Sequence, residues 1–436
     1  MLYPDRIEYR LGGDDFELPL MFAARQLFPH KGLKDVAGEV KAQLATLQLP
    51  DLAGATVALT AGSRGVANQA TILRATADWL KERGAKPFIV PAMGSHAGAR
   101  AESQLEFIAG YGITEETMNV PIKSCMDVVQ LGATPSGFPV YCDKMAWEAE
   151  YIMPVHRIKP HSDFKGPIES GLCKMLVIGL GKHKGATAIH DLGFGVFAGL
   201  IPEAARIFLD SGKVLAGLAM VEDAHDETMR IAAIPTGDII EREKELLAEA
   251  KEEMARFFLS SIDVLVVEEV GKDISGAGMD PNITGRPSSD QRDGFNAPPI
   301  KRIALLGITE LSHGNAGAPG AADVVTVDFM KQYDPAASYT NVLTSRILEG
   351  ARMPMVANND RDAMKIALTC CFGLKPEEAR IVQIANTLCL SDMLLSEAYL
   401  PEIRNDPRFE VLSEPLPVRF DADGRLARLP RAHHSA

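Results

Sequence analysis

The chain has 436 residues, of which 46% are hydrophobic and 24% are charged, with 37 glycines and 27 prolines, so a folded protein of at least two domains is expected. Its net charge of −13 at pH 7 and its pI near 5.3 disfavour a surface that binds nucleic acid, because phosphates would be repelled. Small molecules are therefore the expected partners.

The sequence also lacks the signals of membrane and secreted proteins. No apolar run approaches the roughly 20 residues that span a bilayer, and residues 1–19 lack a basic region followed by an apolar one. The six cysteines have no Cys-x-x-Cys spacing, which disfavours both a disulfide framework and a zinc ribbon. We expect a cytoplasmic protein that binds neither membrane nor nucleic acid and that can form a homo-oligomer.

The first half of the chain predicts a parallel sheet. A β-rich segment at 56–61 is followed by helical spacing of apolar residues over 67–83 and by a second strand from residue 86. A strand, helix, strand unit of this kind builds parallel sheets. Further strands are expected at 148–155, 214–222 and 229–235, and a further helix at 201–212.

The longest helical pattern, 238–258, precedes a new strand at residue 262, and we place the domain boundary there. Residues 1–260 are expected to form a cofactor-binding catalytic α/β domain, and residues 261–436 a second α/β domain that completes the substrate cleft. The fold class is thus two α/β domains with mostly parallel sheets and a cleft between them. In the second domain we expect strands at 302–308, 323–327 and 380–384, and helices at 330–348 and 360–372.

Histidines gather in one part of the chain, and histidine suits both proton transfer near neutral pH and the binding of nickel or zinc. Four lie within 35 residues: His156, His161, His183 and His190. His96 lies in a glycine-bracketed turn after a predicted strand, where it can face a ligand, and His313 has a similar setting and is a weaker candidate. For any single histidine, a surface or hydrogen-bonded core position is the commoner explanation.

Segment 166–190 combines basic residues with glycines and apolar residues, as a ligand site would. Lys174 lies between Cys173 and the apolar run at 175–178, where burial would lower the pKa of its amine and make it nucleophilic. A solvated surface charge is the ordinary alternative. The glycines at 179, 181 and 185 lack the spacing and the later acidic residue of a dinucleotide fingerprint, which disfavours a Rossmann dehydrogenase.

Three features together resemble the lactate racemase family: GSHAGA at 94–99, a Pro-His pair followed by G-x-x-K-M within 160–175, and a histidine 16 residues after that lysine. The resemblance implies a nickel-pincer nucleotide, a pyridinium-3-thioamide-5-thiocarboxylate mononucleotide with nickel, covalently attached to Lys174. It implies that His190 ligates the nickel and that His96 and His161 form the acid/base pair. Separate biosynthesis proteins make this cofactor, so recombinant protein can lack it.

The chain departs from the family in three places. The early Asp-x-Thr-Arg motif is Ala61-Gly62-Ser63-Arg64 here, so the arginine is kept as Arg64, in a cofactor- and substrate-binding role, and the aspartate is lost. The spacing of 13 between the acid/base histidine and the lysine is longer by three than in lactate racemases themselves. In place of the family's Tyr-Gln-x-x-Lys cluster, we expect Arg286 and Lys272 to bind the substrate.

The resemblance implies a racemase or epimerase of a 2-hydroxy acid. Hydride would pass to and from the tethered nickel-pincer nucleotide while the histidine pair handles the hydroxyl proton. Two alternatives stay open: a zinc-dependent hydrolase that uses the histidines of 156–190, and a non-catalytic protein that binds an organic acid. Metal content and covalent mass on Lys174 separate the three.

Overall fold

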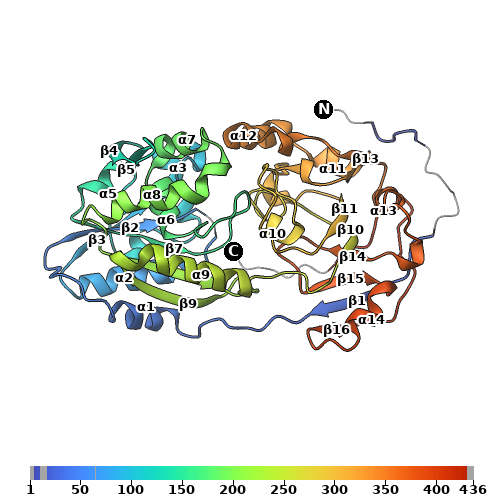
Figure 1. Cartoon of the computed structure of the whole chain (residues 1–436), viewed down its shortest axis with the longest axis horizontal. Coiled ribbons are helices and arrows are strands. Elements are labelled where there is room, and N and C mark those ends of the chain that lie inside the picture. Colours follow the sequence, from blue (N-terminus) through green and yellow to red (C-terminus); the bar gives the residue numbers. More distant parts are fainter. Residues whose placement is uncertain (1–3, 10–16, 64, 430–436) are drawn as a thin grey trace. The chain divides into compact units, whose positions relative to one another are not determined.

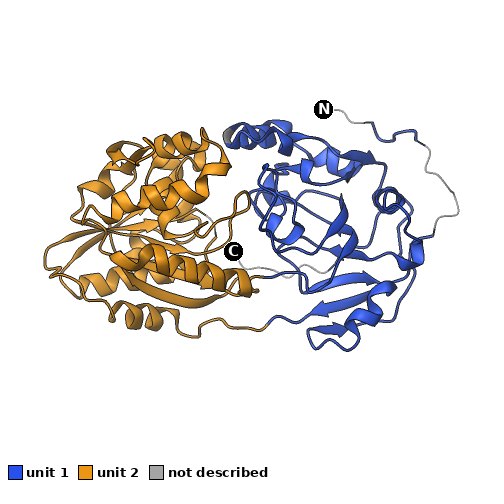
Figure 2. Cartoon of the chain, in the orientation of Figure 1, with its two compact units in different colours: residues 1–28, 255–435 blue, residues 29–254, 436 orange. Residues whose placement is uncertain are grey.

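The structure is a computed structural model that describes residues 4–9, 17–63 and 65–429. It divides into two compact units: unit 2 is Pro29–Met254, and unit 1 is Met1–Phe28 with Ala255–Ser435 (Figure 2). The chain thus passes into unit 1 close to the predicted boundary at 260. The expectation that residues 1–28 belong to the first domain is wrong, because strand β1 (Met21–Gln26) pairs with two strands of unit 1.

Unit 2 is an α/β unit whose elements follow the predicted order (Figure 1). Its strands are β2 (Thr56–Ala61), β3 (Lys86–Pro91), β4 (Val128–Ala133), β5 (Pro139–Asp143), β6 (Tyr151–Met153), β7 (Val155–Arg157), β8 (Ala216–Glu222) and β9 (Thr228–Pro235). Its helices are α1 (Val36–Leu44), α2 (Gln69–Lys81), α3 (Ala101–Ala109), α4 (Glu115–Met118), α5 (Lys144–Glu148), α6 (Leu172–Lys174), α7 (Lys182–His190), α8 (Phe197–Leu209) and α9 (Ile239–Glu253).

Parallel pairing brings the ends of several strands in unit 2 to one edge. β2 pairs in parallel with β3 and β6, and β7 pairs in parallel with β8. The Thr60 hydroxyl accepts a hydrogen bond from the Val155 amide at 2.9 Å and so joins the two sheets. The predicted strand at 148–155 is two short strands, β6 and β7, because Pro154 has no amide to donate to a ladder. The turns after β2 and β3 are where ligands bind in such sheets.

The helix α6, a π-helical turn, η2 (Met175–Gly179), and α7 form a helical run that is interrupted by a turn at Leu180 and Gly181, after which Lys182 has a left-handed backbone with φ of 52°. Turns of this kind are rare and are often found at functional sites. At the start of α7, Lys182 is fully buried and forms an ion pair of 3.0 Å with the equally buried Asp143 at the end of β5. Its ammonium also donates to the Pro91 carbonyl at 2.5 Å, at the end of β3.

Replacing Lys182 with methionine is expected to lower the free energy of unfolding by about 3 to 5 kcal/mol, because Asp143 would stay buried without its counter-ion. Lys184→Met is the matched control: Lys184 is exposed and lies over the ring of Tyr141 in a cation–π pair, so its replacement should cost less than about 1 kcal/mol. Urea unfolding of both variants measures the difference. Equal stabilities would show that the buried pair contributes nothing.

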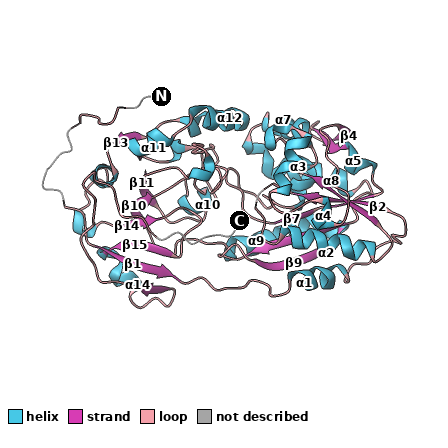
Figure 3. Cartoon of the chain, turned by 180° about the vertical axis from the view of Figure 1, so that it is seen from behind, coloured by secondary structure: helices cyan, strands magenta, loops and turns pink. Residues whose placement is uncertain are grey.

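Unit 1 holds one large sheet in the order β13-β12-β11-β10-β14-β15-β1-β16, seen as magenta arrows in Figure 3. The first five strands are parallel, and β15, β1 and β16 are antiparallel additions at one side. Besides β1, its strands are β10 (Ile262–Val267), β11 (Ile300–Leu305), β12 (Val324–Thr326), β13 (Met355–Ala357), β14 (Ile381–Ile384), β15 (Asp392–Ser396) and β16 (Phe409–Val411). Its helices are α10 (Pro281–Thr284), α11 (Val327–Gln332), α12 (Pro335–Ser345), α13 (Asp360–Thr369) and α14 (Leu400–Ile403).

The expected helix at 330–348 is interrupted, and α11 and α12 stand in its place. Pro335 cannot donate a helical hydrogen bond, and the Asp334 side chain accepts the amides of Ala336 and Ala337 to begin the second helix. The two-domain α/β class with mostly parallel sheets is therefore confirmed, with this difference inside the second domain.

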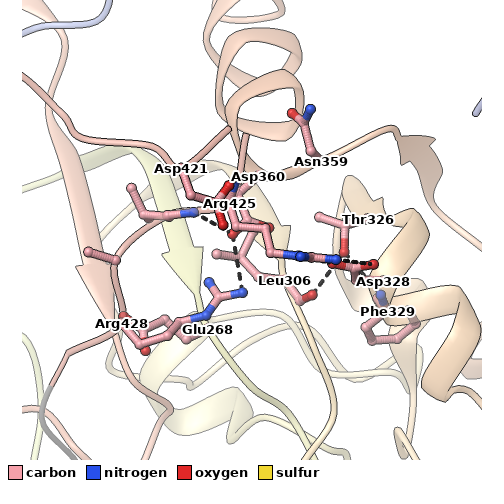
Figure 4. Close-up of polar contacts among 12 residues, drawn as sticks. Glu268, Leu306, Thr326, Asp328, Phe329, Asn359, Asp360, Asp421, Arg425 and Arg428 are labelled. Carbon is pink, nitrogen blue, oxygen red and sulfur yellow. Dashed lines mark hydrogen bonds and ion pairs between the residues drawn. The ribbon is translucent and has the colours of Figure 1, made fainter. Parts of the chain in front are cut away.

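The C-terminal segment runs along the carboxyl ends of the unit 1 strands (Figure 4). Arg425 pairs with Asp328 at 2.7 Å, and Arg428 pairs with the buried Asp360 at 3.1 Å. The Leu429 amide donates to Glu268, the residue after β10, at 2.9 Å. These contacts place the chain's own backbone at the edge of this sheet.

No single helix in the described part of the chain is long and apolar enough to cross a membrane; α7 with the segment Phe194–Leu209 passes only as a pair bent by 95°.

Candidate active site

Two of the predicted histidines meet at one aromatic cluster of unit 2. The rings of His161 and His190 lie 6.0 Å and 5.4 Å from the ring of Phe194. Phe164 and Phe197 complete the cluster, and His161 lies 4.5 Å from Phe164. Histidines in the loop after β7 and at the end of α7 are thus brought to one apolar surface, which restricts water around both.

The fully buried carboxylate of Glu169 binds the loop that carries His161. This carboxylate accepts the His161 amide at 2.7 Å and pairs with Lys165 at 3.2 Å and with Lys251 of α9 at 2.6 Å. The Asp163 amide donates to Nδ1 of His161 at 3.0 Å. The loop and the ring of His161 are therefore both held by hydrogen bonds.

His96 lies in the exposed turn after β3, and its imidazole is hydrogen-bonded to the loop after β2. Its Nδ1 is 2.5 Å from the Ser63 hydroxyl, and Ser63 is 8% exposed. The Gln104 amide donates to the carbonyls of Gly94 and His96 and accepts from Lys182, so the turn is tied to the start of α7.

Lys174 lies on the first turn of the helical run, half-buried, and its ammonium donates to the Ser170 hydroxyl at 3.3 Å. Its charge acts on His156, whose ring packs against the backbone of Gly62 after β2: a Cβ at Gly62 would lie 2.6 Å from the ring. Within the described residues, the buried Nδ1 atom of His156 has no hydrogen-bond partner. A polar atom left this way marks a place where a bound group would fit.

Burial lowers the pKa of His156 from 6.5 to about 3, assisted by three basic neighbours, Arg157, Lys174 and Lys159. Between these two pKa values the unfolded chain binds a proton that the folded protein does not bind. The free energy of unfolding therefore falls as the pH falls through this window.

His156→Gln is expected to remove this dependence in protein without cofactor. At about pH 5 its acid-induced loss of stability should be about 2 kcal/mol smaller than that of the wild type, from a pKa difference of this size. Urea unfolding at about pH 5 and pH 7 measures it, with the exposed His183→Gln as the control. The same pH dependence in His156→Gln and in the wild type would contradict the assignment.

Sequence reasoning missed Glu243, a fully buried carboxylate on α9. It accepts the Cys173 amide at 2.9 Å, at the start of the turn that carries Lys174, and a Cβ at Gly171 would collide with it. Burial raises its pKa to about 7. The available signal was a glutamate on the apolar face of a helix, at helical spacing from Ile239 and Leu247.

Other predicted residues lie outside this group. Arg64 is not among the described residues. His183 is exposed on α7, and His313 belongs to unit 1, where it ends a short helical turn with a left-handed backbone. Lys272 is also in unit 1, and its ammonium donates to the Gly276 carbonyl at 2.8 Å.

Arg286, which the sequence predicts to bind a substrate carboxylate, has protein groups as its partners in this structure. Its guanidinium pairs with Asp323 at 2.5 Å and donates to three main-chain carbonyls, those of Ala321, Ile300 and Lys301. All of these partners of the guanidinium lie in unit 1, so Arg286 joins the segment after α10 to the start of β11. Its acidic partner, Asp323, lies 37 positions further along the chain.

No group of three or more histidine, cysteine or acidic side chains in the described part of the chain is arranged to hold a metal ion. The four histidines that lie close together in the sequence therefore give the zinc hydrolase alternative no support.

These features define an α/β protein with a basic and imidazole-rich site at the carboxyl edge of its first sheet. Residues 55–196 match the lactate racemase N-terminal domain, and the match contains His96, His161, Lys174 and His190. This part of the chain is therefore similar to lactate racemases.

One of the solved structures that the chain resembles shows the same fold. The lactate racemase apoprotein from Thermoanaerobacterium thermosaccharolyticum is 15% identical, with a TM-score of 0.52 over 84% of this chain and 94% of that one. A crystal structure of a protein from Thermotoga maritima is 14% identical, with a TM-score of 0.49 over 74% of this chain and 84% of that one. No curated protein matches the chain by sequence.

Proposed function

We propose that this protein is a racemase or epimerase of a 2-hydroxy acid that works with a nickel-pincer nucleotide. The observation that carries the proposal is the meeting of His161 and His190 on Phe194, with Lys174 at the start of the helical run that ends in His190. The match of residues 55–196 to the lactate racemase N-terminal domain supports a racemase, and the cofactor and substrate class are our extension of it.

The residues fit the proposed cofactor. Lys174 offers a half-buried amine for the covalent bond, and His190 offers an imidazole nitrogen to nickel. Within the described residues, the buried Nδ1 of His156 has no hydrogen-bond partner and could bond to a bound group. Lys182 cannot compete as the tether, because its amine is buried in the ion pair with Asp143. When bound, the nickel-pincer nucleotide would accept the C2 hydride of the substrate and return it.

The protein's own residues would then manage protons and solvent. His96 and His161 would hold and release the substrate's hydroxyl proton, and the phenylalanines around His161 would exclude water from it. Arg64 and Lys272 remain our candidates for contact with the substrate carboxylate. The 2-hydroxy acid and the cofactor biosynthesis proteins are the partners that we propose.

A substrate deuterated at C2 tests the proposed reaction. Protein made together with the cofactor biosynthesis proteins should convert one stereoisomer into the other in ordinary water and keep the label at C2, because the same hydrogen returns as hydride. Protein made without them should be inactive. Loss of the label to water would indicate proton abstraction, and loaded protein that turns over no 2-hydroxy acid, or that carries zinc and no added mass, would contradict the proposal.

A further inference from the structure

The order of the parallel strands in unit 1 reverses at β10. The strands β11, β12 and β13 follow on one side of β10, and β14 lies on its other side. Sheets with this arrangement bind ligands at the carboxyl ends of the two strands where the order reverses. Glu268 follows β10, Gln383 lies on β14, and Gln383 donates to Glu268 at 2.7 Å. Residues 421–429, which we call the strap, contact both side chains and so occupy this position (Figure 4).

Two buried carboxylates bind the main chain of the strap. Glu268 accepts the Leu429 amide at 2.9 Å, and Asp360 accepts the Leu426 amide at 2.8 Å. Glu268 is 2% exposed and Asp360 is 1% exposed, and burial raises the pKa of both carboxyls. Carboxylates so far removed from water need hydrogen-bond donors from the protein or from a ligand, and the strap supplies them.

The same place also binds a carbonyl and an arginine of the strap. Gln383, itself 1% exposed, donates to the Ala427 carbonyl at 3.1 Å. Arg428 pairs with Asp360 at 3.1 Å, and the Arg428 side chain is 37% exposed. Without the strap, the buried carboxylates would lose donors while they keep their charge, which is costly. The site therefore fits an occupant that offers backbone amides, a carbonyl and a guanidinium, as an extended segment with an arginine does.

The strap is bound mainly through polar groups. Of residues 421–429, only Gly424 and Leu426 are buried, and most of the others are exposed. Leu426 forms an isolated bridge with Phe420, so this part of the chain pairs with itself and not with a strand of the sheet. Segments with few buried apolar side chains open at a lower free energy than the core of a sheet. We therefore expect the strap to leave its site while unit 1 stays folded.

We propose that Glu268, Gln383 and Asp360 form a binding site for an extended peptide segment that carries an arginine, and that the strap is its displaceable resident. A segment of another protein chain with the same donors binds there when the strap is out. The site selects two backbone amides three residues apart, with the arginine directly before the second of them. This inference uses no residue of unit 2, so it holds or fails independently of the proposed racemase chemistry.

Hydrogen exchange in the full chain tests whether the strap opens by itself. The amides of Leu426 and Leu429 should exchange about 100-fold or more faster than the amides of β10, which lie between two strands of the sheet. Equal rates would show that the strap leaves only when unit 1 unfolds, and they would overturn the proposal.

Arg428→Gln should speed exchange at Leu426 and Leu429 by a further 10-fold, roughly, because the strap loses a hydrogen bond between charged groups. Exchange in β10 should not change. Asp360→Asn removes the other partner of the pair and should have the same effect, so the measurement does not depend on one variant. The control is Arg404→Gln, an exposed arginine after α14 with the same change in net charge, which should leave the strap amides unchanged. Unchanged exchange in both Arg428→Gln and Asp360→Asn would contradict the proposal.

A fluorescent synthetic peptide with the sequence of residues 421–429 tests the chemistry of the ligand. In the wild type the tethered strap competes at a high effective concentration, so the peptide should bind the Arg428→Gln protein about 10-fold or more tightly than the wild type. The same peptide with Arg428→Gln should bind that protein about 10-fold more weakly, because it lacks the guanidinium. Fluorescence anisotropy measures both affinities. Absence of binding to the Arg428→Gln protein, or equal binding of the two peptides, would overturn the proposal.

Discussion

Protein in which Lys174 is replaced by arginine is expected to carry no cofactor mass and to lose turnover down to that of unloaded protein. The covalent bond needs a neutral, nucleophilic amine, and a guanidinium keeps its charge at any ordinary pH. Arginine preserves the length and charge of the side chain and its contact with Ser170, so a change in packing would not explain the loss.

Intact mass and peptide mapping of protein made with the biosynthesis proteins measure this result. Lys184→Arg is the matched control, because Lys184 is exposed on α7 and should leave the added mass and the activity unchanged. Added mass on a peptide that contains Lys182 or Lys184, with Lys174 unmodified, would refute the assignment. Such a finding for Lys182 would also require the buried pair with Asp143 to open.

His96→Ala and His161→Ala are each expected to lower turnover by roughly 100-fold or more while the cofactor stays attached, which is the size of a lost proton-transfer or oriented donor group. Neither ring is needed for the covalent bond at Lys174. The loss should appear in kcat, because both side chains act on the hydroxyl as its charge changes.

Steady-state rates in both directions, together with the mass of each variant, check this prediction. His183→Ala is the control, since His183 is exposed on the same helix as His190 and should keep near wild-type turnover. If either variant, with its cofactor loaded, turns over substrate at near the wild-type rate, that histidine does not take part in catalysis. If a variant loses the cofactor as well, its role is in binding and not in proton transfer.

The amino-acid sequence by itself determined the α/β class and most strands and helices, and it indicated His96, His161, Lys174 and His190 as candidate site residues. Helical and strand periodicity are local properties, so the segments at 56–61, 67–83 and 262–269 could be assigned without knowing their neighbours. The spacing of 16 between Lys174 and His190 can be read from the sequence too, although the two residues lie on different helices, α6 and α7. A helix or strand that is predicted from local spacing forms in the folded protein when its apolar side is also the side that the fold buries.

Only the tertiary structure decided the partners of these residues. Ser63 and His96 are 33 positions apart, and Cys173 and Glu243 are 70 apart. No local pattern specifies which of many acidic side chains will face Arg286, and the fold selected Asp323. The first residues of the chain likewise join unit 1 because β1 finds its partners near the other end of the chain. Strand pairing and buried ion pairs depend on which distant segments are brought together, so hydrogen-bond partners and proton positions at this site follow from the packing.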